Sequence, residues 1–187
     1  MNKDKTAALL SLALTPKVPP KSLKESILRA VAAPPLELRG SHGPVSLEHG
    51  VARTGTGARA ELRIRGQALI VLNENTRATL RRGARGLELL LEAGGAMVHV
   101  VKNTAFSVQL PLGLIQVKGT WFYAESRGPK ESYVCLCEGK LWLSAGGLRK
   151  VMKSSDHVAV TLALRKGKPT LSKAPTLHWH PDTGPVG

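Results

Sequence analysis

Hydrophobic and polar residues alternate with a period of two through most of the chain beyond residue 36. The clearest apolar positions of this kind are Ala60, Leu62 and Ile64 in one segment and Phe106, Val108 and Leu110 in another. Such alternation places apolar side chains on one face of an extended segment and polar side chains on the other. Both segments are therefore predicted to be half-buried β-strands.

Glycines and polar turn residues interrupt these segments at short intervals, and no long pattern of helical period lies between them. Many short strands separated by turns are typical of an all-β body, and they argue against a doubly wound sheet covered by helices. We predict a mainly β fold of many short strands, built as a β-solenoid, a β-roll or a sandwich. The pattern alone fits all three architectures.

The first 35 residues follow a helical pattern instead. Residues 22–25, with the sequence Ser-Leu-Lys-Glu, fit a capping box, which marks the start of a helix. Behind this cap, one apolar stripe follows the helical period and needs a partner surface, either on the body of the protein or on another protein. The residues of this predicted partner-binding stripe are Leu23, Ile27, Leu28 and Val31.

These patterns divide the chain into three parts. Residues 1–35 are predicted to form a short α-helical N-terminal segment that ends in a proline-rich linker. Residues 36–164 are predicted to form the all-β domain. Residues 165–187 are rich in Lys, Pro and Gly and show little periodicity, so we expect an irregular C-terminal arm.

The chain is strongly basic, with 27 Lys and Arg against 13 Asp and Glu and a net charge of +14 over 187 residues. Such a field favours acidic partners, including nucleic acid, anionic lipid and acidic protein. The bases are scattered and aromatic residues make up only 4% of the chain, so a solvated basic surface is favoured over a nucleic-acid face on the strands between Arg63 and Arg85.

No apolar run approaches the roughly 20 residues that a membrane-spanning helix needs. Residues 1–15 have only a weak likeness to a signal peptide, because Asp4 interrupts the basic head and no small-residue cleavage site precedes Pro16. We therefore expect a cytoplasmic protein, with a periplasmic location as the alternative if residues 1–15 act as a weak signal peptide.

Six short segments resemble, in order, those of the FecR domain. They are residues 54–62, 72–77, 89–95, 106–108, 117–122 and 137–141, and the resemblance covers roughly residues 45–150. FecR proteins are periplasmic sensors that regulate ferric-siderophore uptake together with an outer-membrane transporter and an ECF sigma factor. The resemblance implies a β domain that acts as a binding or sensing module rather than as an enzyme.

Residues 12–28 are similar to the stretch that follows the sigma-binding domain in many ECF anti-sigma factors. The resemblance therefore implies a protein partner, either an ECF sigma factor or another regulator. A typical FecR protein also has a full helical sigma-binding domain and one membrane span, whereas this sequence shows only a short helical segment and no span. Signalling across a membrane does not follow from the resemblance.

The two cysteines of the chain, Cys135 and Cys137, lie in one strand-like run. Residues two apart project from the same face of a strand, and this geometry favours chelation of an ion over a bond between the two sulfurs. If residues 138 and 139 formed a two-residue hairpin turn, Cys137 would lie opposite Lys140 and Cys135 opposite Trp142.

A zinc or other soft-metal site would need two further ligands, because structural zinc sites are four-coordinate. The candidate metal ligands are Cys135, Cys137, His157, His178 and His180, and the bound group would be zinc, iron or haem. The competing interpretation, in which the cysteines and histidines bind no metal, is favoured, because cysteine is often buried in strands and histidines in a tail are usually solvated.

No catalytic constellation is visible, since no nucleophile elbow or placed pair of carboxylates occurs. The segment Thr54-Gly55-Thr56-Gly57 resembles a phosphate-binding loop, but no Gly-Lys-Ser/Thr follows it, so we predict a turn between strands. We predict a non-enzymatic regulatory or sensing module of the FecR, anti-sigma-like type. The alternatives are a soluble metal- or redox-binding β protein that uses the two cysteines with the C-terminal histidines, and a nucleic-acid-binding protein.

Overall fold

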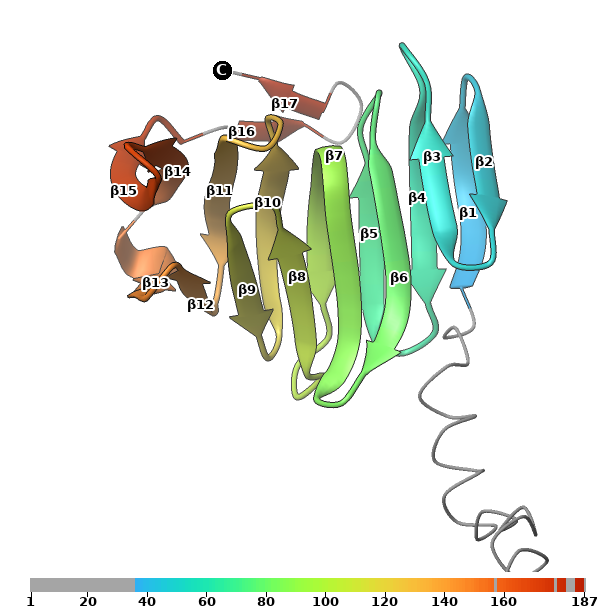
Figure 1. The fold of residues 1–187 in the computed structure, drawn as a ribbon. Coiled ribbons are helices and arrows are strands. Elements are labelled where there is room, and N and C mark those ends of the chain that lie inside the picture. The colour runs from blue at the N-terminus through green and yellow to red at the C-terminus, as the bar shows by residue number, and fades with distance from the viewer. Residues whose placement is uncertain (1–35, 157, 177, 181–183, 187) are drawn as a thin grey trace, which may run out of the picture. The chain divides into compact units, whose positions relative to one another are not determined.

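Most of the chain that the structure describes is β-strand. The computed structural model describes residues 36–156, 158–176, 178–180 and 184–186 (Figure 1). The predicted N-terminal helix, with its stripe of Leu23, Ile27, Leu28 and Val31, lies outside these residues. In the part that is described, no helix has the length and apolar character needed to cross a membrane.

Strands follow one another with short connections from residue 36 to residue 174, and one 3-10 helix, η1 (Ser154–Asp156), interrupts them. The strands are β1 (Leu36–His42), β2 (Val45–Glu48), β3 (Val51–Thr54), β4 (Arg59–Ile64), β5 (Ala68–Leu72), β6 (Arg77–Gly83), β7 (Gly86–Val100), β8 (Phe106–Leu110), β9 (Gly113–Val117), β10 (Thr120–Ser126), β11 (Glu131–Glu138), β12 (Lys140–Ala145), β13 (Leu148–Lys153), β14 (Ala159–Arg165), β15 (Lys168–Ala174), β16 (His178–His180) and β17 (Gly184–Val186). The mainly β prediction is confirmed.

The first fifteen strands form one sheet that folds back on itself into two layers, so that it resembles a nearly closed barrel (Figure 1). Layer A has the order β1-β4-β5-β7-β10-β11-β14-β15, and layer B has the order β2-β3-β6-β7-β8-β9-β12-β13. Strand β7 belongs to both layers. Its pairing with β8 is parallel, whereas the other pairs are antiparallel. Strands β16 and β17 pair only with each other.

The main core lies where the two layers face each other. Apolar residues from alternate positions of both layers meet there, as the period-two pattern predicts, and most of these residues are Leu, Ile, Val and Ala. Phe122 is the one large aromatic side chain of this cluster that is fully buried. Each buried aliphatic side chain contributes roughly 1.5–3 kcal/mol relative to full exposure, so the face-to-face arrangement is where the fold gains most of its stability.

Strand β7 changes layer at Gly94 and Gly95. The backbone of Gly94 has φ +75°, and a Cβ atom there would lie 2.6 Å from the Cα atom of Thr76 and 2.8 Å from the carbonyl oxygen of Asn75. A Cβ atom on Gly95 would collide with the hydroxyl of Tyr123. Only glycine allows the backbone to turn and approach its neighbours this closely.

Buried threonines hold this crossing in place. The Thr76 hydroxyl accepts a hydrogen bond from the Gly95 N–H at 3.0 Å and lies 3.2 Å from the Gly95 carbonyl oxygen. The Thr54 hydroxyl accepts from the Thr76 N–H at 2.9 Å and donates to the carbonyl of Asn73. Residues 54–57 therefore form a turn between strands, as predicted, and Thr54 connects this turn to the crossing.

Two details of the prediction are wrong. Strands β11 and β12 do not form a hairpin, because Gly139, with φ +91°, carries the chain from layer A to layer B. Trp142 therefore lies opposite Gln116 and Val151 rather than opposite Cys135. The irregular arm expected from residue 165 instead begins with β15, which pairs with β14 through a turn at Lys166 and Gly167.

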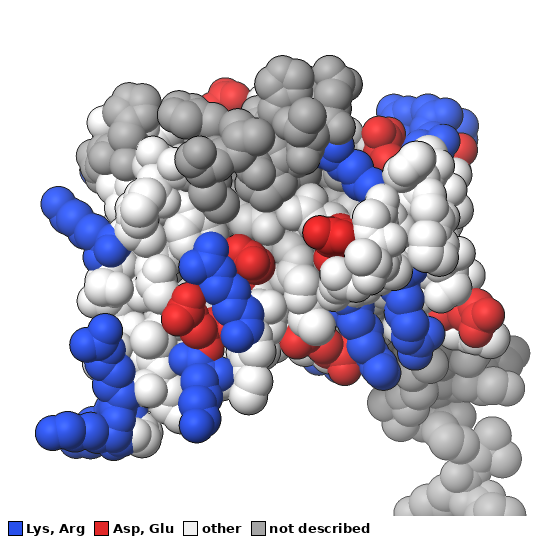
Figure 2. Space-filling view, turned by 90° about the horizontal axis from the view of Figure 1, so that it is seen from above, with Lys and Arg blue, Asp and Glu red and all other residues white. Residues whose placement is uncertain are grey.

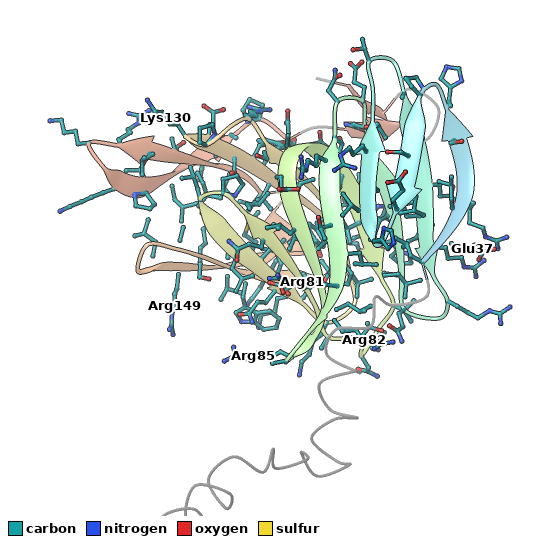
Figure 3. All side chains as sticks on the ribbon, turned by 45° about the vertical axis from the view of Figure 1, so that its right-hand side comes forward. Glu37, Arg81, Arg82, Arg85, Lys130 and Arg149 are labelled. Atoms are coloured by element: carbon teal, nitrogen blue, oxygen red, sulfur yellow. The ribbon has the colours of Figure 1, made fainter. Side chains whose placement is uncertain are left out.

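Charged side chains of both signs are spread over the face of the molecule that Figure 2 shows. Arg77 and Arg81 on the outer face of layer B pair with Glu92 and Glu88, each at 2.8 Å, whereas Arg63 belongs to β4 in layer A. Figure 3 shows Arg82 and Arg85 at the β6–β7 hairpin, away from Arg149 on β13. The bases between Arg63 and Arg85 therefore do not make one continuous face.

The crossing of β7 yields a prediction about stability. Replacing Gly94 by Ala should lower the free energy of unfolding by about 2–4 kcal/mol, because the new methyl group meets backbone atoms and the positive φ is unfavourable for Ala. Urea unfolding followed by circular dichroism would measure it. Gly40→Ala is the matched control, since a Cβ there has no neighbour within 4 Å and should change stability by about 0.5 kcal/mol or less. Equal stability of the two variants would contradict the proposed role of the crossing.

Candidate functional site

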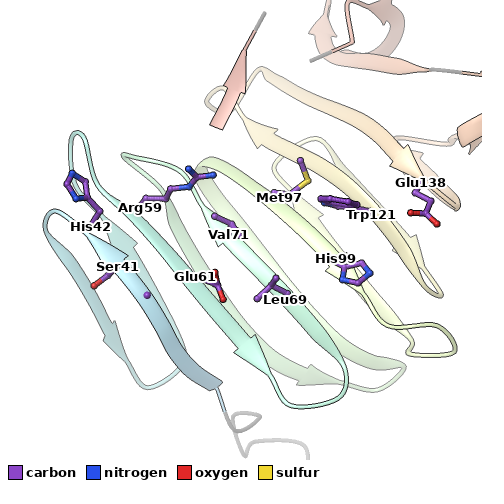
Figure 4. A pocket seen from close by; sticks show the side chains of 11 residues that line it. Ser41, His42, Arg59, Glu61, Leu69, Val71, Met97, His99, Trp121 and Glu138 are labelled. Atoms are coloured by element: carbon purple, nitrogen blue, oxygen red, sulfur yellow. The ribbon is translucent and has the colours of Figure 1, made fainter. Parts of the chain in front are cut away.

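A groove crosses the outer face of layer A (Figure 4). Its volume is about 590 Å³, and strands β1, β4, β5, β7, β10 and β11 supply its walls and floor. The lining residues are Gly40, Ser41, His42, Arg59, Glu61, Leu69, Val71, Met97, His99, Trp121 and Glu138. A concave, largely apolar site with a few polar groups around it is the usual form of a small-molecule site.

The floor of the groove follows from the strand register. Leu69 lies opposite His99, and His99 in turn lies opposite Trp121, so that three neighbouring strands place these side chains in one row. Val71 lies opposite Met97 in the next row. The rings of His99 and Trp121 are tilted by 54° with their centroids 5.9 Å apart, and Trp121 keeps 41% of its surface exposed. The indole is thus available for contact with a ligand.

The charged groups lie around this apolar floor. Figure 4 shows Arg59 and Glu61 on β4 at one side of the groove and Glu138 at the other side, beyond Trp121. Arg59 is half-buried, whereas Glu61 and Glu138 are exposed. The groove thus provides a guanidinium, two carboxylates and two imidazoles, those of His42 and His99, beside the apolar side chains of its floor, which suits binding of an amphipathic organic molecule.

The two cysteines adjoin this groove. Met97 lies opposite Tyr123, and Tyr123 lies opposite Cys135, so the groove row continues to the first thiol. Cys137 occupies a β-bulge, because Trp121 pairs with Glu138 while the next residue of β10 pairs with Leu136. A bulge gives the strand one extra residue and redirects its side chains. Cys135 is buried and Cys137 is exposed, and both are free cysteines.

The thiols of Cys135 and Cys137 are in direct contact, as their placement on one face predicts. Their mutual hydrogen bond raises the pKa of Cys137 well above its usual range, and burial and the charge of Cys135 act in the same direction. Although Cys137 as a residue is exposed, its sulfur lies against the buried Cys135, which accounts for the contribution of burial. Cys137 therefore remains a neutral thiol near neutral pH.

A second small core surrounds Cys135 on the outer side of layer A. It contains Met97, Tyr123, Tyr133 and Ala159 in addition to Cys135. The Tyr133 hydroxyl donates to the carbonyl of Pro175 at 2.7 Å, and burial raises the pKa of Tyr123. The first thiol is thus enclosed by aromatic and apolar side chains, and the second thiol offers the more exposed point of approach.

The remaining predicted metal ligands are not tested by these contacts. His157 and the side chains of His178 and His180 lie outside the residues that the structure describes. Among the side chains it does describe, no group of three or more His, Cys, Asp and Glu residues is placed to hold a metal ion. The metal site at Cys135 and Cys137 stays a prediction, as does the partner-binding stripe of the N-terminal segment.

The groove was not predicted from the sequence. His99 is exposed on β7, and its neighbour Trp121 comes from a strand 22 residues further along the chain. The sequence pattern that could have indicated the groove is an apolar or aromatic residue at an outward position in each of several strands, as at Leu69 and Trp121. That signal becomes a site only when the strand pairing is known.

Comparison with known proteins identifies the central part of the chain. Residues 50–141 match the family described as FecR protein. None of the curated proteins compared gives a match.

Two crystal structures of a candidate anti-sigma factor from Parabacteroides distasonis ATCC 8503 share the fold, with TM-scores of 0.56 and 0.57 at 13% identity. Each likeness covers 67% of this chain and 60% of the other. The chain therefore spans less than two thirds of the length of these relatives.

The contact between the thiols predicts how Cys137 reacts. Alkylation of Cys137 by iodoacetamide, followed by peptide mass spectrometry from pH 7 to 10, should be slower than for a free thiol of pKa about 8.5, because less thiolate is present. Cys135→Ala removes the hydrogen bond and the neighbouring charge, so the rate at pH 8 should rise about tenfold or more, a factor of ten for each unit by which the pKa falls. If Cys137 of the wild type reacts with the pH dependence of a free thiol, and Cys135→Ala does not change that dependence, the two thiols do not interact.

Proposed function

We propose that this chain, in which residues 50–141 are a FecR domain, is a non-enzymatic regulatory protein of the anti-sigma-like type that senses a ligand and binds a protein partner. The observation that carries the proposal is the agreement of family and fold, since the domain match falls within a two-layered β body that is similar to a candidate anti-sigma factor. The specific partner would be an ECF sigma factor or another regulator.

The groove on layer A supplies the sensing part of this proposal. A volume of about 590 Å³ is in the range of small-molecule sites, which run from about 300 to 1,000 Å³. A ligand that covers the row of Leu69, His99 and Trp121 would bury the exposed part of the indole. Binding would thereby add contacts across six neighbouring strands on the outer face of layer A, and it would stabilise the folded protein.

Partner binding needs a different surface from the groove. Two surfaces suit this role: the predicted N-terminal helix, residues 22–32, with its apolar stripe, and the basic exterior of the β body. Ligand or metal status would then adjust the affinity for the partner, provided that the ligand binds differently to the free and the partner-bound protein.

A second function is favoured by one specific observation, the contact between the thiols of Cys135 and Cys137. Two adjacent sulfurs in a partly enclosed site suit a soft metal ion or a redox reaction. In this alternative the protein binds zinc, iron or haem, or takes part in thiol–disulfide exchange, and it does not act by binding a regulatory protein. Nucleic-acid binding between Arg63 and Arg85 is less favoured, because Arg77 and Arg81 are already paired with carboxylates.

Affinity purification from the native cell tests the regulatory proposal. The tagged chain is expected to retain a sigma factor or another transcription regulator, identified by mass spectrometry, whereas a tagged chain that begins at residue 36 should lose the partner if the helix of residues 22–32 holds it. Retention by the shortened chain would assign the partner to the β body. If neither chain retains a regulator, the proposal fails.

Metal analysis tests the second function. If the thiol pair holds a metal, protein purified under reducing conditions should contain zinc, iron or haem, and Cys135→Ser together with Cys137→Ser should abolish that content, because serine is a poor ligand for soft metals. Cys137→Ser alone should lower the metal content of the purified protein and leave its melting temperature near that of the wild type, since Cys137 is exposed. Metal-free wild-type protein would exclude the metal form of this alternative.

A further inference from the structure

Strands β12 to β15 form the end of both layers, and this end carries an unusual surface. Strand β13 is the last strand of layer B and β15 is the last strand of layer A, so within the described residues each has one edge without a paired strand. The two hairpins approach each other there, since a Cβ on Gly146 would lie 2.6 Å from Cγ of Pro169. We call the strands β12 to β15 the basic end.

The basic end has a nearly uniform charge. Between residues 140 and 173 the chain has eight bases and a single acid, Asp156. The bases are Lys140, Arg149, Lys150, Lys153, Arg165, Lys166, Lys168 and Lys173. Figure 2 shows blue side chains along the left-hand end of the molecule, which is the β13–β15 end in Figure 1, and Figure 3 shows Arg149 pointing away from the body.

Exposed apolar side chains gather at the same end. Of the seven large hydrophobic residues that are exposed in the described part of the chain, four belong to strands β12 to β14. They are Trp142, Leu148, Val151 and Leu164, with 38% to 46% of their surface accessible. Val151 lies opposite Trp142 across the hairpin. Leu148 and Leu164 instead occupy inward positions, in line with the buried Met152 and Leu162. Isolated exposed apolar residues are ordinary, but apolar residues exposed on both faces of an end that is bordered by charge are typical of an interaction site.

The backbone of β13 offers hydrogen-bonding groups along its free edge. Ala145 and Leu148 close the two-residue turn of the β12–β13 hairpin, and closing pairs of such turns are hydrogen-bonded. Leu148 and every second residue after it therefore bond to β12. The N–H and C=O groups of Arg149, Val151 and Lys153 consequently face away from β12, where no strand of the described chain pairs with them.

We propose that the β13 edge binds an acidic, extended segment of a partner protein as an additional strand of layer B. Backbone hydrogen bonds to Arg149, Val151 and Lys153 would hold the segment, and the bases of the hairpin would pair with its carboxylates. Its carboxylates would lie on the outer face, beside Arg149 and Lys153, and the apolar side chains that alternate with them would lie on the inner face, beside Leu148. This inference deepens the proposed function, which requires a protein partner, because it names the surface and the chemistry of that partner.

The charge of the edge determines which occupant is favoured. Lysines on edge strands are a common defence against self-association, because two identical edges repel each other. The positive charge that repels the β13 edge of a second copy of the chain attracts an acidic strand. The same basic residues therefore prevent self-association and favour binding of an acidic partner. Nucleic acid is less favoured, because the Lys140 Nζ atom lies 4.9 Å from the centre of the Trp142 ring and occupies a face on which a base would stack.

The test uses the full chain and three synthetic probes. They are an eight-residue peptide of alternating Glu and Val, the matching peptide of Gln and Val, and a single-stranded oligonucleotide. The acidic peptide should bind, measured by calorimetry at 50 mM salt, at least tenfold more tightly than the neutral one. In amide hydrogen exchange, the N–H groups of Arg149, Val151 and Lys153 should become protected in its presence.

Two variants separate the backbone from the charge. Val151→Pro removes an outward N–H without removing a bond to β12, and it should weaken binding of the acidic peptide at least tenfold while the melting temperature of the protein stays near that of the wild type. The triple variant Arg149→Gln, Lys150→Gln and Lys153→Gln should weaken binding to a similar extent. The matched triple variant Arg53→Gln, Arg65→Gln and Lys102→Gln changes the net charge equally at exposed positions elsewhere and should change affinity less than threefold.

Four outcomes would overturn the proposal. Failure of the acidic peptide to bind would do so, and so would equal binding of the neutral peptide or equal losses in the two triple variants. Preferential binding of the oligonucleotide, unaffected by Val151→Pro, would assign the basic end to nucleic acid instead. None of these results bears on whether the native chain retains a regulator, so the inference and the proposed function can fail separately.

Discussion

The passage of β7 from one layer to the other is the constraint on which the rest of the structure depends. The strand pairs with β6 and β8 before Gly94 and with β5 and β10 after it, so a single bend sets the separation of the layers and the register of four neighbours. The hydroxyls of Thr76 and Thr54 satisfy the backbone groups that the bend exposes. Without that bend the apolar faces would have no partner across the core.

The layers then give the two sides of each strand different functions. Inward positions are occupied by aliphatic residues, whereas outward positions of layer A contain the groove, the thiol pair and the second small core. Because neighbouring strands fix which outward residues meet, His99 and Trp121 become neighbours although neither strand shows a binding motif. The outer face is thus assembled from residues that are distant in the sequence, on a support that the inner face makes rigid.

The sequence was sufficient for features that depend on one strand and its flanking turns. The all-β character followed from local alternation, and the shared face of Cys135 and Cys137 followed from their spacing. Features that depend on pairing between strands could not be predicted in this way. The position of Trp142 was wrong because Gly139 directs the chain into the other layer, a choice that a glycine in a turn does not reveal. Strand β15 was missed because none of its residues is fully buried, so its pattern of Lys, Ser and Thr resembles that of a loop.

The order of strands has a consequence for how the chain acquires its structure. No strand of the two layers pairs with one more than three places further along the chain, so every new strand finds its partner among segments that are already present. Such nearby pairing lowers the loop-closure entropy that usually slows β proteins. A chain emerging from the ribosome could therefore lengthen its roll step by step, with each completed hairpin serving as the template for the next.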